Sequence, residues 1–133
     1  MELKNIYIFE WLNDEEIQYF DTIAKRQFFK KWEIVINEWD ACNDIAYIIE
    51  FWSVDVFYKG EKVSSIPEWG IFWEIALIIN EPRSASIIAA QDLKVLEFHR
   101  NDFIMLYKKS WNFEEIRNKI LSRIKKNFYW VKE

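Results

Sequence analysis

The chain has 133 residues, about half of them hydrophobic and close to a third charged, which predicts a soluble globular protein and argues against disorder. Its formal net charge of −4 gives no electrostatic reason to expect nucleic acid or an anionic membrane surface as a partner. No apolar run approaches the ~18 residues of a membrane span, and the N-terminal segment does not resemble a signal peptide. The single cysteine, Cys42, excludes an internal disulfide and favours a reducing, cytoplasmic setting.

Glycine and tryptophan depart from ordinary usage. The chain contains two glycines and eight tryptophans, whereas an average glycine frequency of ~7% predicts about nine glycines. The shortfall in glycine is roughly the excess in tryptophan. The positions of the tryptophans, considered below, suggest a reason for this match.

The first predicted element is a helix. Asn13 and Glu16 have the Asn-x-x-Glu spacing of a helix start, and the apolar residues Ile17, Phe20 and Ala24 follow on one predicted face. We therefore expect an N-terminal helix that packs this face against the core.

Between residues 27 and 98 the pattern changes to short apolar runs, rich in β-branched and aromatic residues and separated by polar breaks. Lys59-Gly60, between Val56 and Val63, predicts a hairpin turn. We expect about seven or eight short strands in this region. The clearest candidates are EIVINE, AYIIEF, SVDVFY, EKVSSI, SASIIAA and LKVLEF.

Two helices are expected after Arg100. The segment RNDFIMLYKK predicts a short one, and NFEEIRNKILSRIKKNFYWV predicts a longer one that Asn112 and Glu115 would open. The apolar stripe of the longer helix is typical of a face that packs on a core or a dimer seam. It comprises Phe113, Ile116, Ile120, Ile124 and Phe128.

This order of elements predicts a mainly β fold with flanking helices. We expect a β-roll, or jelly-roll-like double-stranded barrel, with an N-terminal helix and two C-terminal helices. The chain shows no internal repeat, low-complexity stretch or linker, so we expect a single domain over residues 1–133.

The stretch IFWEIALIINEPRSAS, residues 71–86, contains residues suited to bind a phosphate and a sugar. EIALII predicts one helical turn or two with free N–H groups at its start, Pro82 ends it, and Arg83 follows directly. Ser84 and Ser86 add small hydroxyl groups. A short helix N-terminus, an arginine and hydroxyl residues together favour an anion site, and Glu74 is a good acceptor for a sugar hydroxyl.

This segment closely resembles the phosphate-binding cassette of cyclic nucleotide-binding domains, F-G-E-x-A-L-x(5)-R-[ST]-A. The matching residues are Phe72, Glu74, Ala76, Leu77, Arg83, Ser84 and Ala85. A second family motif, G-[DE]-x-[GAC] followed by an apolar strand and G-x-V-x-V, is similar to EWDACNDIAYIIEFWSVDV. Its matching residues are Asp40, Cys42, Tyr47, Val54 and Val56, and the resemblance extends over nearly the whole chain.

The resemblance implies a non-catalytic regulatory module that captures a cyclic purine mononucleotide, cAMP or cGMP, and needs no cofactor. It implies that Glu74 accepts the ribose 2′-hydroxyl and that Arg83 pairs with the exocyclic oxygens of the cyclic phosphate. Backbone N–H groups near Ala76, and the Ser84–Ala85 stretch, would complete the cradle. The expected ligand-binding residues are Phe72, Trp73, Glu74, Ile75, Ala76, Leu77, Arg83, Ser84 and Ala85.

The resemblance also implies that the last helix folds over the base as a lid, so that the ligand changes the position of the C-terminal helices. Spacing rather than motif selects Ile116, Ile120 and Ile124 as the candidate lid residues. Ser84, after the arginine, is compatible with either cAMP or cGMP.

Tryptophan stands where the family usually has glycine at positions 32, 39, 52, 69 and 73, and Trp11 is a further candidate. Glycine serves such turns because it adopts positive φ and lets the backbone approach a ligand, whereas tryptophan there costs of order 1–3 kcal/mol. We hypothesise that the source cell translates UGA as glycine and that these codons have been written as tryptophan. If the tryptophans are real, Trp73 obstructs the cradle.

Three other functions stay open as alternatives. The first is a ligand-free structural or dimerisation module on the same fold. Under the leading interpretation as well, a second copy or an effector domain is the expected protein partner. The second is a truncated transcription regulator, although the chain ends at Glu133 without room for a helix-turn-helix, so we expect no nucleic-acid binding by this chain alone. The third is a cupin-like enzyme, but His99 is the only histidine, so we expect neither a metal site nor a catalytic residue.

Overall fold

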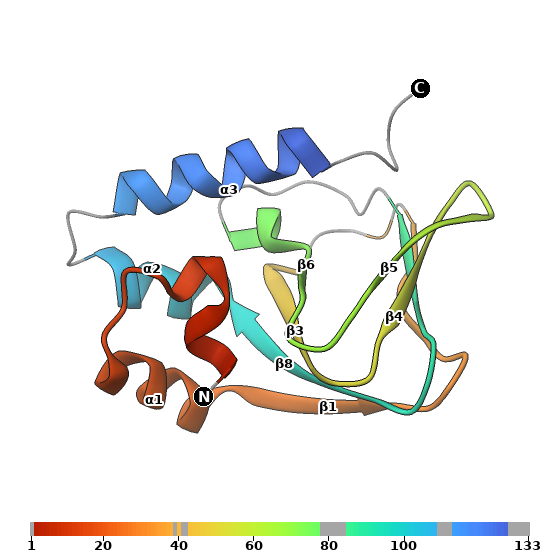
Figure 1. Ribbon diagram of the computed structural model, residues 1–133, viewed down its shortest axis with the longest axis horizontal. Coiled ribbons are helices and arrows are strands. Elements are labelled where there is room, and N and C mark those ends of the chain that lie inside the picture. Colours follow the sequence, from red (N-terminus) through yellow and green to blue (C-terminus); the bar gives the residue numbers. More distant parts are fainter. Residues whose placement is uncertain (1, 39, 41–42, 78–84, 109–112, 128–133) are drawn as a thin grey trace.

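A computed structural model of the chain, which describes residues 2–38, 40, 43–77, 85–108 and 113–127, contains two antiparallel sheets with helices gathered along one side (Figure 1). In chain order the elements are η1 (Glu2–Asn5), η2 (Tyr7–Phe9), α1 (Asp14–Ile23), β1 (Lys25–Phe29), β2 (Ile34–Ile36), β3 (Ile45–Phe51), β4 (Val54–Tyr58), β5 (Glu61–Ile66), β6 (Ile71–Phe72), η3 (Glu74–Leu77), β7 (Ser86–Ala89), β8 (Leu93–His99), α2 (Arg100–Lys108) and α3 (Phe113–Asn127).

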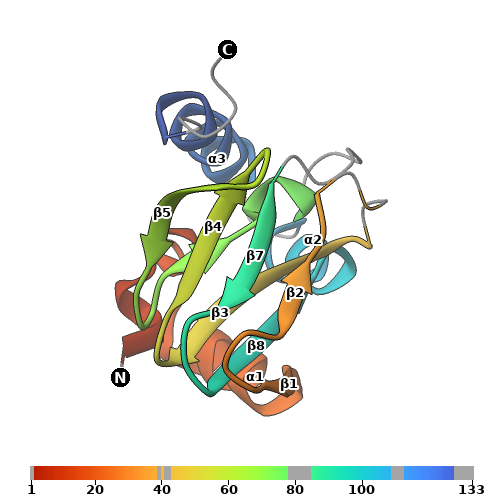
Figure 2. The ribbon, with the colours of Figure 1, turned by 90° about the vertical axis from the view of Figure 1, so that its right-hand side faces the viewer.

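The strands form two sheets of four. The first has the order β1-β8-β3-β6 and the second the order β2-β7-β4-β5, with every neighbouring pair antiparallel. Figure 2 shows the second sheet as one wall, with β3 and β8 behind it. The predicted hairpin is confirmed: β4 and β5 are joined by Lys59 and Gly60, whose φ values of 53° and 83° suit a two-residue turn.

One part of the core fills the space between the two sheets. It takes buried side chains from β3, β6 and β8 of the first sheet, from β2, β4 and β7 of the second, and from the segment between β6 and β7. Its members are Ile36, Tyr47, Ile49, Val54, Val56, Phe72, Trp73, Ala76, Ala85, Ile87, Ala89, Leu93 and Val95. We call this set the roll core.

The other part of the core lies between the first sheet and the helices. The face of α1 that the sequence predicted is buried here, through Ile17 and Phe20. Phe98 of β8 contacts the rings of Phe9 and Phe20, with ring centroids 5.6 Å and 4.5 Å away. Aromatic side chains thus fix the helices on the outer face of the first sheet.

The start of α1 has the predicted cap. The Asn13 side chain accepts a hydrogen bond from the Glu16 N–H, and the Glu16 carboxylate accepts one from the Asn13 N–H, at 2.8 Å and 2.9 Å. This reciprocal capping box satisfies two N–H groups that the helix itself cannot pair. The similar helix start predicted for α3 depends on Asn112, which lies outside the described residues.

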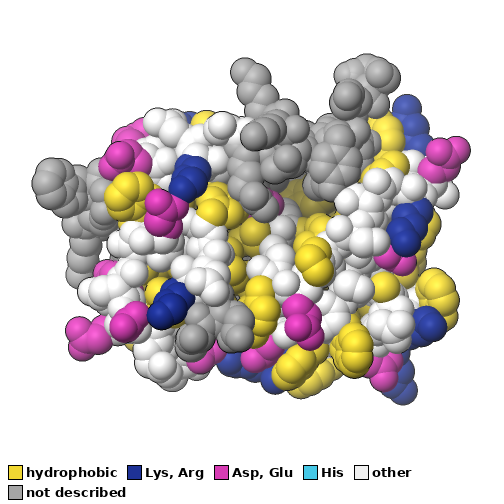
Figure 3. All heavy atoms as spheres, in the orientation of Figure 1, with side chains coloured by type: hydrophobic (Ala, Val, Ile, Leu, Met, Phe, Trp, Pro, Cys, Tyr) yellow, Lys and Arg dark blue, Asp and Glu magenta, His cyan; other side chains and the backbone are white. Residues whose placement is uncertain are grey.

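The mainly β fold and its flanking helices are confirmed, and the structure adds elements that the sequence did not predict. These are the strands β1 and β6 and the N-terminal turns η1 and η2. None of the described helices is long and apolar enough to cross a membrane. On the face drawn in Figure 3, acidic and basic side chains alternate with apolar ones and form no field of one sign.

Candidate functional site

The predicted cassette begins at the end of β6 and returns in β7. Phe72 ends β6, Trp73 follows, and η3 covers Glu74–Leu77 as a single 3₁₀ turn. Ala85 immediately precedes β7. The structure thus brings the two ends of the motif to the roll core, whereas Arg83, Ser84 and the side chain of Ile75 lie outside the described part of the chain.

The apolar members of the cassette divide between the two parts of the core. Phe72, Ala76 and Ala85 face the roll core, where Phe72 stacks on Tyr47 of β3 with ring centroids 5.1 Å apart. Leu77 faces the helices instead. The turn η3 is therefore held between the inside of the roll and the helical side, which is the position from which it could transmit a change from one to the other.

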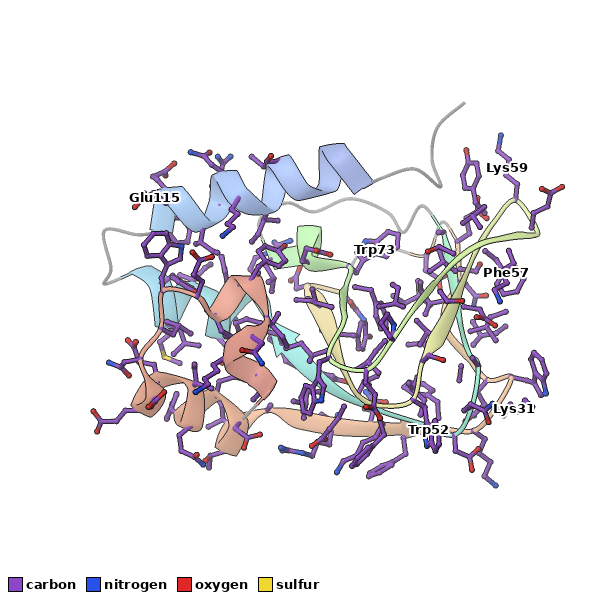
Figure 4. All side chains as sticks on the ribbon, viewed as in Figure 1. Lys31, Trp52, Phe57, Lys59, Trp73 and Glu115 are labelled. Carbon is purple, nitrogen blue, oxygen red and sulfur yellow. The ribbon has the colours of Figure 1, made fainter. Side chains whose placement is uncertain are left out.

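Trp73 lies inside the roll. It is only 5% exposed, it belongs to the roll core, and its φ of 61° is in the left-handed region. Figure 4 shows its side chain between η3 and the sheet that contains β4 and β7. Its indole therefore occupies space beside the turn that the sequence predicts to hold a phosphate.

Glu74, the first residue of η3, contacts the N-terminal segment. Its Oε2 accepts a hydrogen bond from the hydroxyl of Tyr7 at 3.0 Å, although the two residues are 67 positions apart. Tyr7 was not among the predicted site residues, because no motif marks a tyrosine in the N-terminal segment as a partner of the cassette. The carboxylate that the sequence predicts to accept a ribose hydroxyl therefore already accepts a hydrogen bond from Tyr7.

Arg100, the first residue of α2, makes a hydrogen bond to the backbone of η3. Its Nε donates to the carbonyl of Ala76 at 2.8 Å, and a terminal nitrogen lies 3.1 Å from Oδ1 of Asp44. The Ala76 N–H of η3 donates to the carbonyl of Trp73, the residue before the turn, at 3.0 Å. The backbone of the turn is thus tied to the helices through an arginine that the sequence analysis did not single out.

The candidate lid residues lie on α3, which packs against η3. Ile116 and Ile120 are fully buried among the helices, in the same part of the core as Leu77, Phe103 and Tyr107. The side chain of Ile124 lies outside the described part of the helix. In this arrangement Ile116 and Ile120 of α3 are part of the hydrophobic core.

The second motif lines the roll. Tyr47 of β3 and Val54 and Val56 of β4 are buried in the roll core, as an apolar wall beside the cassette requires. Asp40 is exposed, and Cys42 lies outside the described residues.

A surface pocket of about 510 Å³ lies away from the cassette, among the β1–β2, β3–β4 and β7–β8 turns, and contains none of the predicted ligand-binding residues. Its lining comprises Phe28, Phe29, Lys30, Glu33, Phe51, Trp52, Asp92, Leu93 and Lys94.

The model of the cyclic nucleotide-binding domain family matches residues 26–110, which include both sheets and the whole cassette. The chain belongs to the cyclic nucleotide-binding domain family. Within the described residues, no group of three His, Cys, Asp or Glu side chains could hold a metal ion.

Curated relatives of the domain include regulatory subunits of cAMP-dependent protein kinase. That of Candida albicans is 35% identical over 91 residues, which cover 68% of this chain and 20% of the relative. That of Mucor circinelloides is 29% identical over 104 residues, covering 76% and 23%. The domain thus spans about a fifth of the length of these relatives.

Solved structures agree on the fold. The catabolite activator protein of Thermus thermophilus has a TM-score of 0.74 and 21% identity, covering 87% of this chain and 56% of that one. A cyclic nucleotide-binding-like protein of Brucella abortus has a TM-score of 0.72 and 22% identity, covering 80% and 95%. A protein kinase A regulatory subunit of Trypanosoma cruzi, described as cAMP-independent and bound to guanosine, has a TM-score of 0.73 and 23% identity, covering 79% and 38%.

Proposed function

We propose that this domain binds a cyclic purine nucleotide, cAMP or cGMP, and couples binding to the position of its C-terminal helices. The observation that carries the proposal is the placement of the cassette. Ala76 of η3 and Ala85 before β7 lie in the roll core, whereas Leu77 of η3 lies in the part of the core between the first sheet and the helices. The motif, the family and the named relatives support a ligand at this turn.

In the proposed complex, Arg83 pairs with the cyclic phosphate and Glu74 accepts the ribose hydroxyl. The ribose hydroxyl would have to share the Glu74 carboxylate with the hydroxyl of Tyr7, which already donates to its Oε2. The arginine contact would be charge-assisted and bidentate, which makes it the strongest single polar contact expected in the site.

The coupling would run through contacts that end on η3. Arg100 holds the Ala76 carbonyl from the start of α2, and α3 packs on the same turn. A ligand that shifts η3 must therefore disturb these contacts. It can move the helices only by as much as its affinity differs between the two helix arrangements.

Trp73 favours a second function, that of a ligand-free module on the same fold. An indole that is 5% exposed and packed in the roll core fills space that the sugar and phosphate would need. In that case the domain would act through its surface alone, as a structural or dimerisation unit. Neither proposal assigns the domain a reaction of its own, and in both its protein partner would be a second copy or an effector domain.

A binding titration separates the two functions. cAMP and cGMP are titrated calorimetrically into the chain and into its Trp73→Gly variant, and each titration is repeated with Arg83→Ala added. If the domain binds a cyclic nucleotide, the Trp73→Gly variant should show saturable binding, and Arg83→Ala should reduce the binding free energy by ~1.5–3 kcal/mol. If no version binds either nucleotide, the ligand-free module is correct.

A further inference from the structure

Four tryptophans have a backbone conformation that favours glycine. The φ values are 78° at Trp32, 72° at Trp52, 62° at Trp69 and 61° at Trp73. A Cβ atom crowds the backbone in this region, and glycine alone escapes that penalty. Trp11, the remaining tryptophan that the structure describes, is not in this conformation.

Chance does not account for this pattern. A few per cent of non-glycine residues have positive φ, so four among five described tryptophans have a chance probability on the order of 10⁻⁵. The other two non-glycine residues with positive φ in the described part of the chain are Asp44 and Lys59. Aspartate enters this region more readily than most residues, and Lys59 is a turn residue of the β4–β5 hairpin.

At Trp32 and Trp69, hydrogen bonds to the strands rather than the side chain fix the backbone angles. The Trp32 N–H donates to the carbonyl of Ala89 at 2.8 Å, and the Trp69 N–H donates to the carbonyl of Ile49 at 2.7 Å. Both bonds tie a turn to a strand of one of the two sheets. The fold therefore requires a left-handed residue at positions 32 and 69, whichever amino acid stands there.

The exposed indoles gain little that would offset the strain. Trp32 is 67% exposed and Trp52 is 58% exposed, whereas a tryptophan that stabilises a fold does so by burying its large apolar surface. Lys31 lies over the Trp32 ring at 5.2 Å, but a cation–π pair in water is weak. Within the described residues, no contact that would favour tryptophan over glycine is found at these two turns.

We propose that positions 32, 52, 69 and 73 carry glycine in the protein that the source cell makes. In this proposal the gene has a UGA codon at each position. The cell's ribosomes insert glycine there, whereas a genetic code that reads UGA as tryptophan gives the printed sequence. The two tryptophans far from the cassette, Trp32 and Trp52, carry the inference independently of any ligand. At Trp73 the consequence is functional, because glycine there would leave room beside η3 inside the roll and let the backbone approach a phosphate.

The direct test is peptide mass spectrometry of the protein isolated from the cells that carry the gene, together with the codons of the gene. Glycine in the peptides that contain positions 32, 52, 69 and 73, and UGA at each codon, is the expected result. Tryptophan in these peptides, or UGG at these codons, overturns the inference. Glycine at position 73 without nucleotide binding would instead leave this inference standing and refute the proposed function.

Thermal unfolding of recombinant variants gives a second readout that does not need the source cell. Trp32→Gly and Trp52→Gly relieve the strain at exposed sites, so each is expected to raise the melting temperature by about 3–5 °C. Trp11→Gly is the matched control, since Trp11 is 40% exposed but lacks positive φ, and it is expected not to raise the melting temperature. If Trp32→Gly and Trp52→Gly melt no higher than the parent chain, tryptophan is not strained at these turns, and the structural ground for the inference is wrong.

Discussion

The hydroxyl of Tyr7 donates a hydrogen bond to Oε2 of Glu74 at 3.0 Å, which joins the N-terminal segment to the first residue of η3. A ribose hydroxyl would compete with this donor for the same carboxylate. We predict that Tyr7→Phe, measured in the Trp73→Gly background, tightens cyclic nucleotide binding about 2–10-fold, the equivalent of one net hydrogen bond. Tyr19→Phe, at a half-exposed position, is the control and should leave affinity unchanged. Weaker binding by Tyr7→Phe would mean that Tyr7 positions Glu74 instead.

The aromatic contacts of Phe98 predict a large loss of stability on truncation. Its ring is fully buried and contacts those of Phe9, Phe20 and Phe103. Phe98→Ala should lower the free energy of unfolding by about 3–5 kcal/mol, which urea unfolding would measure. Phe28→Ala, where the ring is 72% exposed, should cost less than about 1 kcal/mol. Equal losses in the two variants would contradict the assigned core.

Tyr107 predicts a decline in stability at alkaline pH. Burial raises the pKa of its phenol well above the usual range, with Glu16 and Glu10 adding to the effect, and its hydroxyl donates to the Ile8 carbonyl. The folded state therefore keeps the proton that the unfolded chain loses near pH ~10. Stability is complete below that pH and falls by up to about 1.4 kcal/mol per pH unit above it.

The variant Tyr107→Phe tests this origin of the decline. It should be less stable at neutral pH, because the Ile8 carbonyl loses its donor. Its free energy of unfolding should fall less steeply than that of the parent chain between pH 10 and 11. Parallel curves would show that Tyr107 does not cause the decline.

The capping box of α1 predicts a measurable cost for a single side chain. Asn13→Ala removes the acceptor of the Glu16 N–H and should destabilise the domain by ~1 kcal/mol. Asn13→Ser keeps a capping oxygen and should retain most of that stability. A Ser variant as unstable as the Ala variant would show that the contact does not stabilise the helix.

The sequence predicted the elements whose signals are local. Lys59-Gly60 marks a hairpin by itself, and Asn13 with Glu16 marks a helix start, because in each case neighbouring residues make the contact. Strand β6 has two residues, too few to show a period, and β1 begins with the polar run Lys25–Gln27. Both depend on partners far along the chain, which no local pattern reveals.

The position of the candidate site in the fold was predictable in part, because its motif is also local in sequence. The motif located Phe72, Ala76 and Ala85, and the glycine positions of the family anticipated the left-handed φ at Trp73. The contacts that surround the cassette could not be predicted. Tyr7 reaches Glu74 across 67 residues, and Arg100 reaches Ala76 across 24. Such pairs follow from the packing of the whole fold.

The central claim is that η3 and Arg83 hold a cyclic nucleotide once position 73 leaves room for it. The most direct measurement is a calorimetric titration of cAMP and cGMP into the variant with Trp32→Gly, Trp52→Gly, Trp69→Gly and Trp73→Gly, with and without Arg83→Ala. We predict one saturable site that Arg83→Ala weakens about 10–150-fold. No binding by the folded variant, or equal affinity in the presence of Arg83→Ala, would contradict the account.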